Sequence, residues 1–137
     1  TQAMNTKSIK AFVLISATMM AGSAFADADT LSVSGQDLGV SVTIDSVEAS
    51  ENGFIVIHDI VDGKPVAPSS IGHTYITAGK HENVRIPLDK MPSGKALAML
   101  HKDTGKLGVY EFGADNTDVD LPVVVNDKPV VQPFDVN

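Results

Sequence analysis

Short segments that alternate apolar and polar residues, each followed by turn-forming residues, recur along the chain from Val40 onward. In the first segment Val40, Val42 and Ile44 alternate with small polar side chains, and Val47 continues the pattern. Alternation with a period of two is typical of β-strands that have one face against a core. The same alternation recurs in Asn83–Leu88, and further short β-rich segments bounded by turn residues are Phe54–Ile60, Ile71–Thr77, Ala96–Lys102, Val109–Phe112, Leu121–Val125 and Val130–Phe134. About eight short strands, spaced by roughly 8 to 12 residues, predict an all-β sandwich or barrel in a single domain.

The turn sequences support this prediction. Asn52-Gly53 and Asn126-Asp127 lie between apolar segments and are typical of β-hairpins. Pro87 cannot donate a backbone hydrogen bond, so its strand is expected at a sheet edge or a strand end. Lys95–Lys102 contains good helix formers but is bounded by glycine-containing turns, and it is therefore predicted as a strand. We expect Leu121–Val125 to pair with Val130–Phe134 across the second hairpin turn.

The segment Phe54–Ile60 is apolar on both of its faces. Ile55 and Ile57 alternate with Phe54, Val56 and His58, so the pattern leaves open which face belongs to the core. A long β-rich segment of this kind also offers an edge to a partner strand if it lies at the border of a sheet.

Residues Met4 to Ala26 have the features of a secretory signal peptide. Lys7 and Lys10 precede an apolar stretch, and Ala24-Phe25-Ala26 provides the small residues that signal peptidase accepts, which places the cut before Asp27. A membrane anchor would need about 20 apolar residues, which is more than this stretch contains. We therefore expect an upstream remnant plus signal peptide over 1–26, a flexible lead-in over 27–37 and the β-sandwich over 38–137, located in the periplasm or outside the cell.

Charge and composition exclude several classes of function. The chain of 137 residues has a net charge of −7, and removal of both signal-peptide lysines makes it −9. A nucleic acid or an anionic membrane would require a basic surface, so the expected partner is another protein or a second copy of the chain. Cysteine is absent, which rules out thiol catalysis, iron–sulfur clusters and thiolate metal sites.

Several segments carry a resemblance to a known family. They are "FIVIHD" (Phe54 to Asp59), "IGHTYITAGKHENVRIPL" (Ile71 to Leu88), "AMLHKDTG" (Ala98 to Gly105) and "VYEFGAD" (Val109 to Asp115). Over roughly residues 40 to 136, the chain resembles a domain-of-unknown-function family found in haloarchaeal surface proteins and bacterial exported proteins. The resemblance implies a small immunoglobulin-like antiparallel β-sandwich and no established activity.

All four histidines lie in these segments, and they are the main candidates for a site. His58 and His101 each end a strand, and we expect them to meet at one rim of the sandwich, joined by His73, Met99 or Asp103. Imidazoles with a thioether or carboxylate suit Cu or Zn. The alternative is structural, because a histidine at a strand end commonly bonds to a backbone group or a neighbouring carboxylate. His81 opens a different strand.

No catalytic pattern is present in the sequence. The oxygen-rich segment Asp115–Asp120 lacks the glycine and the spaced glutamate of an EF-hand loop, so it is expected to be a solvated turn. The sequence therefore favours an exported, non-catalytic β-sandwich that acts as a binding or structural module. The alternative is a small periplasmic protein that binds copper or zinc through its histidines.

Overall fold

The computed structural model describes residues 29–137, and the segment expected to be a signal peptide lies outside these residues. The described part of the chain is all-β. Its strands are β2 (Thr30–Ser32), β3 (Ser41–Ala49), β4 (Gly53–Val61), β5 (Lys64–Pro65), β6 (Gly72–Ile76), β7 (Gly79–Pro87), β8 (Lys95–Lys102), β9 (Val124–Val125), β10 (Lys128–Pro129) and β11 (Val131–Asp135). Over residues 29–137 no helix has the length and apolarity that crossing a bilayer requires.

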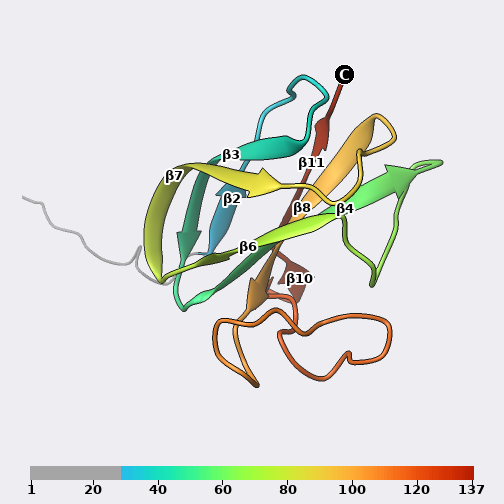
Figure 1. The fold of residues 1–137 in the computed structure, drawn as a ribbon. Coiled ribbons are helices and arrows are strands. Elements are labelled where there is room, and N and C mark those ends of the chain that lie inside the picture. Colours follow the sequence, from blue (N-terminus) through green and yellow to red (C-terminus); the bar gives the residue numbers. More distant parts are fainter. Residues whose placement is uncertain (1–28) are drawn as a thin grey trace, which may run out of the picture.

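The strands form two antiparallel sheets that pack face to face (Figure 1). One sheet has the order β2-β3-β7. In the other, β11, β8 and β4 are neighbours in this order, β6 pairs with the free side of β4, and β5 pairs with its last residues. The strands β9 and β10 form a separate short hairpin. The expected all-β, antiparallel architecture is thereby confirmed.

The space between the sheets is filled by branched apolar side chains. Val42 and Ile44 of β3 and Ile86 of β7 face Ile55 and Ile57 of β4 across the core. Further core residues are Val47, Ala49, Ile71, Ile76, Ala96, Ala98, Leu100, Phe134 and Val136. A core of this size stabilises the domain mainly by removing apolar surface from water.

The inward face of β3 changes partway along the strand. Val42 and Ile44 point into the core, then Asp45 and Ser46 are both exposed, and Val47 points inward again. The β3–β7 register passes from Ile44–Val84 to Ser46–Glu82 without pairing Asn83, which has a φ of 54°, a conformation that asparagine tolerates better than most residues. This break in the β3–β7 pairing falls where strict alternation stops, at Asp45. Val40, expected within this strand, lies before it and is exposed.

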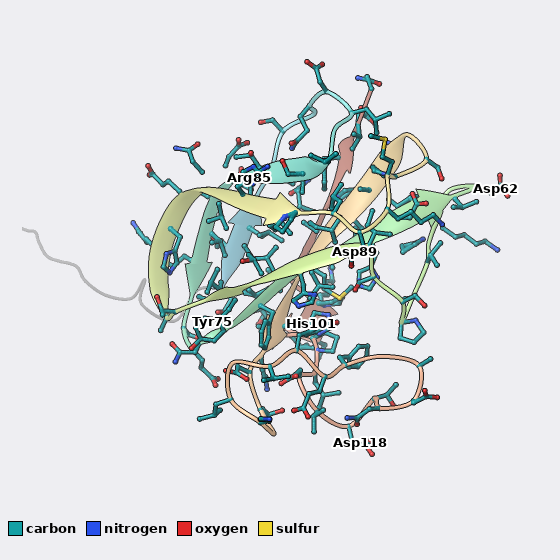
Figure 2. All side chains as sticks on the ribbon, viewed as in Figure 1. Asp62, Tyr75, Arg85, Asp89, His101 and Asp118 are labelled. Carbon is teal, nitrogen blue, oxygen red and sulfur yellow. The ribbon has the colours of Figure 1, made fainter. Side chains whose placement is uncertain are left out.

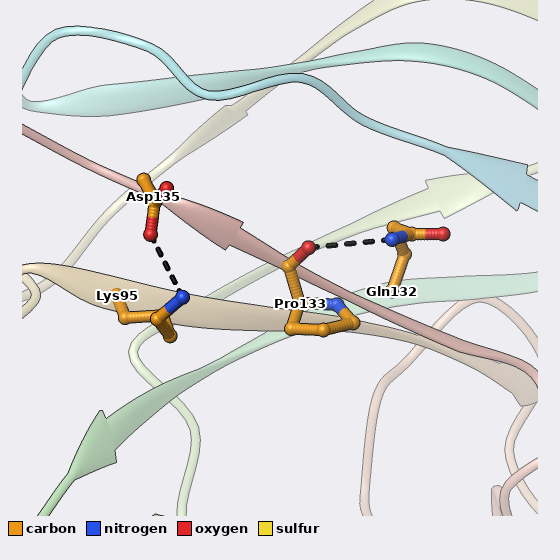
Figure 3. A network of polar contacts seen from close by, with 4 residues as sticks. All are labelled: Lys95, Gln132, Pro133 and Asp135. Atoms are coloured by element: carbon orange, nitrogen blue, oxygen red, sulfur yellow. Dashed lines mark hydrogen bonds and ion pairs between the residues drawn. The ribbon is translucent and has the colours of Figure 1, made fainter. Parts of the chain in front are cut away.

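The edges of the sheets are polar. As Pro87 predicted, β7 is an edge strand, and its Lys80, Glu82 and Arg85 are exposed. At the opposite edge of the other sheet, Lys95 and Asp135 form an ion pair of 2.8 Å between β8 and β11 (Figure 3). Charges and proline at edges disfavour pairing with other chains. The expectation that Phe54–Ile60 offers an edge is wrong, because β4 lies between β6 and β8.

Three sequence expectations need correction in the described part. Val109–Phe112 is not a strand but part of a long loop at residues 103–123, hereafter the 103–123 loop. The turn at Asn126-Asp127 does close a hairpin, but only β9 and β10 pair across it, while β11 pairs with β8. Within the expected lead-in, Thr30–Ser32 is a strand paired with β3, so the folded part begins before residue 38.

Candidate functional site

The outer face of β4 and β8, which is turned away from the other sheet, is also buried. It carries Phe54, Val56 and His58 from β4 and Leu97, Met99 and His101 from β8. In the antiparallel register Phe54 lies opposite His101, Val56 opposite Met99 and His58 opposite Leu97. Both faces of β4 are therefore buried, which answers the question that its sequence left open.

Aromatic side chains cover one end of this outer face. Tyr110 of the 103–123 loop lies 5.3 Å from Phe54, 5.5 Å from His101 and 4.8 Å from His73, measured between ring centroids. Phe112 of the same loop contacts His101 edge-on at 5.1 Å. Figure 2 shows His101 between the sheet and this loop, with Asp118 at the loop's outer side. The apolar residues that suggested a strand at 109–112 thus cover the sheet instead of joining it.

His58 fastens a second segment, residues 62–70, over the other end of the face. Its Nδ1 lies 3.0 Å from the carbonyl oxygen of Val66 and 2.7 Å from that of Ser69. A carbonyl only accepts hydrogen bonds, so Nδ1 carries the proton and donates it. The neighbouring Asp59, also buried, accepts hydrogen bonds from the backbone N–H and hydroxyl of Ser93, each at 2.9 Å.

His101 fastens the 103–123 loop in the same way. Its Nδ1 donates to the carbonyl oxygen of Asp120 at 2.6 Å. The buried carboxylate of Asp120 accepts from the backbone N–H groups of Thr104 and Glu111, each at 2.7 Å, and the Asp120 N–H donates to the Thr104 hydroxyl at 2.8 Å. We call this set of bonds among His101, Thr104, Glu111 and Asp120 the Asp120 latch.

Both rings of the histidine pair keep a free nitrogen. With the proton on Nδ1, Nε2 of a neutral imidazole carries a lone pair. Nε2 of His58 and Nε2 of His101 are buried and have no hydrogen-bond partner within residues 29–137, and the two ring centroids are 6.4 Å apart. Burial lowers the pKa of His101 from its usual 6.5, although the bond to Asp120 opposes this shift. Burial likewise raises the pKa of the Tyr110 hydroxyl.

The expected meeting of His58 and His101 occurs on a sheet face and not at a rim. Because β4 and β8 are antiparallel, their carboxyl ends lie at opposite ends of the sheet, so a shared rim was the wrong geometry. The rings approach instead by leaning toward each other across the outer face.

The other predicted ligands are placed differently. Met99 lies on the outer face and is half-buried. His73 is exposed and borders the aromatic group, and Asp103 accepts a hydrogen bond from the Gly108 N–H at 2.8 Å. His81 lies on β7 in the other sheet, where Nε2 bonds to the Thr77 carbonyl at 2.7 Å. In the described part of the chain, no group of three or more His, Asp or Glu residues is arranged to hold a metal.

Sequence reasoning missed Asp120. This residue was assigned to a solvated turn, and Asp115 and Asp118 of that segment are indeed exposed, but Asp120 is buried with a φ of 51°. The sequence offers only a weak pattern that could have identified it, an acidic residue directly before an apolar segment. This pattern does not distinguish a carboxylate that faces water from one that accepts hydrogen bonds from backbone N–H groups.

Comparison with known sequences identifies the family. The family profile described as "Domain of unknown function (DUF7282)" matches residues 29–137. The chain belongs to this family. Two relatives in Haloarcula hispanica are cell surface glycoprotein 1, 38% identical, and cell surface glycoprotein 2, 36% identical, each over 95 residues and 66% of this chain. The match covers 10% of each glycoprotein, so the chain corresponds to a small part of their length. No solved structure matches the chain.

Proposed function

We propose that this DUF7282 chain is an exported, non-catalytic β-sandwich of immunoglobulin-like architecture that serves as a structural or binding module in the periplasm or at the cell surface. The observation that carries the proposal is how the buried polar residues are used. His58, Asp59, His101 and Asp120 all bond to backbone groups of the loops and turns that cover the sheet. Such bonds serve to hold a fold together.

The relatives and the sequence give independent support. Both relatives are cell surface glycoproteins by name, and residues 4–26 have the pattern of a secretory signal. The absence of cysteine means that packing and hydrogen bonds hold the exported domain without a disulfide, for which the core between two sheets is suited. The acidic net charge favours a protein partner or a second copy over nucleic acid.

Export is tested by fusing alkaline phosphatase, which is active only outside the cytosol, to the carboxyl end of the full chain. We expect active enzyme and a shortened chain that begins at Asp27, and inactive enzyme when residues 4–26 are deleted. Equal activity with and without residues 4–26, or an unprocessed chain in the cytosol, would contradict the location.

The structural role is tested on the exported protein after purification. We expect a single cooperative urea transition and, by sedimentation, either a monomer or a defined complex with a partner or second copy. A broad, non-cooperative transition would show that the chain does not form an autonomous module.

A further inference from the structure

The outer face of β4 and β8 brings together two imidazoles and a thioether. Met99 and His101 are two residues apart on β8 and therefore point to the same side of the sheet. His58 of β4 lies opposite Leu97, so Met99 occupies the position diagonal to His58. Diagonal neighbours in an antiparallel pair are within reach of long side chains. Met99 and Val56, which lie opposite each other, are thus between the two histidines on this face, and Met99 is the one that carries a donor atom.

The two imidazoles are held in the tautomer that ligates metals. Each Nδ1–H is donated to a backbone carbonyl, to that of Ser69 for His58 and that of Asp120 for His101. The lone pair is consequently on Nε2 of each ring, and both Nε2 atoms are buried without a partner within residues 29–137. A backbone carbonyl that accepts the other ring N–H, and so fixes the ring and its tautomer, is the usual support of a metal-binding histidine. Two buried lone pairs without donors also cost free energy that a shared cation would recover.

The separation of the rings suits one shared ion. When two imidazoles bind the same ion through nitrogens at about 2 Å, their centroids lie at most about 6.5 Å apart, with the ion nearly in line between them. The centroids of His58 and His101 are 6.4 Å apart and their planes are inclined by 35°. At this separation the two rings can share an ion in a nearly linear N–metal–N arrangement, and the rings must approach further if a third ligand bends that angle.

The donor set selects the kind of ion. Ca²⁺ and Mg²⁺ require several oxygen ligands, and structural Zn²⁺ sites are almost always four-coordinate. No third His, Asp or Glu joins the pair in the described residues, and cysteine is absent from the chain. Neutral imidazoles with a thioether form an uncharged, soft set, which favours Cu(I). We propose that His58, Met99 and His101 form a Cu(I) site, with both Nε2 atoms and the Met99 sulfur as ligands. This inference does not depend on the proposed structural role.

Anaerobic titration of the purified protein with Cu(I), in competition with the chromophoric chelator bicinchoninate, tests the site. We expect one Cu(I) per chain, withdrawn from the chelator, and no comparable binding of Zn(II). Failure to withdraw Cu(I) from the chelator, or tighter binding of Zn(II) than of Cu(I), would overturn the proposal.

Substitutions distinguish these ligands from other donors. Asparagine places an amide near the position of Nδ1, so His58→Asn and His101→Asn remove Nε2 while retaining a donor for the backbone carbonyl. Each is expected to lower Cu(I) affinity by at least ~100-fold, because even the loss of a group that only hydrogen-bonds to a ligand costs about 10- to 100-fold. His81→Asn is the matched control on the other sheet and should leave the affinity unchanged. Equal affinity of His58→Asn, His101→Asn and the unsubstituted protein would refute the site.

Met99→Leu keeps the side-chain volume and removes the sulfur, so it tests the third ligand without endangering the fold. We expect a loss of about 10-fold or more in affinity. The sulfur contribution to the Cu(I) X-ray absorption spectrum should also disappear. An unchanged affinity and spectrum in this variant would refute Met99 as a ligand, whatever the stability of the histidine variants.

Discussion

Substitution of Asp120 by alanine is expected to loosen the 103–123 loop and destabilise the protein. The carboxylate accepts two backbone hydrogen bonds of 2.7 Å, from Thr104 and Glu111, and both donors lose their partner in the variant. A buried N–H without a partner costs about 1–3 kcal/mol. Because these two groups are only partly buried, we expect about 1–2 kcal/mol for each, or ~2–4 kcal/mol in the free energy of unfolding.

Asp118→Ala is the matched control. It removes the same charge from the same loop, but Asp118 is exposed, so a change within about 0.5 kcal/mol is expected. Asp120→Asn keeps one acceptor oxygen and tolerates the positive φ, and it should give an intermediate loss.

Urea unfolding measures the free energy of these variants, and hydrogen exchange reports directly on the two amides. In the unsubstituted protein the N–H groups of Thr104 and Glu111 should exchange slowly, and in Asp120→Ala they should exchange much faster. If Asp120→Ala changed the free energy of unfolding no more than Asp118→Ala does, and both amides stayed protected, the Asp120 latch would have no energetic role.

Three further outcomes are expected from the structure. Burial holds the pKa of His101 in the folded protein below 6.5, so between pH 6.5 and this lower pKa the unfolded chain binds a proton that the folded chain lacks. The contribution of His101 to the free energy of unfolding should therefore be fully present above pH 6.5 and fall as the pH drops toward the folded pKa. His101→Asn should flatten this dependence in urea titrations repeated at several pH values. Gly53→Ala would bring a Cβ into collision with the His101 carbonyl oxygen and should cost about 2 kcal/mol or more. Gly113→Ala meets no atom within 4 Å and should be near neutral, so equal melting temperatures of the two variants would contradict the close approach at Gly53. Lys95→Ala breaks the ion pair with Asp135, whose two side chains are 54% and 60% exposed. The free energy of unfolding should therefore fall by less than about 1 kcal/mol, and this difference should vanish in about 1 M NaCl. A larger loss that does not depend on salt would contradict a weak, exposed ion pair.

The strands β3 and β7 were predictable because only one face of each lies against the core. Alternation marked both of them, the bounding turns marked β8, and Pro87 marked the edge position of β7. The prediction failed in the 103–123 loop, which packs apolar residues against the outer face of the sheet. Tyr110 and Phe112 look like a strand in the sequence but are apolar because they cover the outer face of the sheet.

The site was predictable in its members but not in its geometry. His58 and His101 stood out as strand-end histidines, yet only the register of β4 and β8 shows that they meet on a face. The burial of Asp120 depends on a positive φ and on two donors distant in sequence, which no local pattern encodes.

The burial of β4 on both faces has a consequence for the protein before it folds. Before the chain folds, Phe54–Ile57 is an uninterrupted apolar, β-prone stretch exposed to other chains. His58 and Asp59 follow it directly and act as gatekeepers, since polar residues that flank such stretches suppress aggregation. His58, which fastens residues 62–70, and Asp59, which accepts hydrogen bonds from Ser93, are thus expected to protect the nascent chain as well, and apolar replacements at these two positions should reduce the secretion yield.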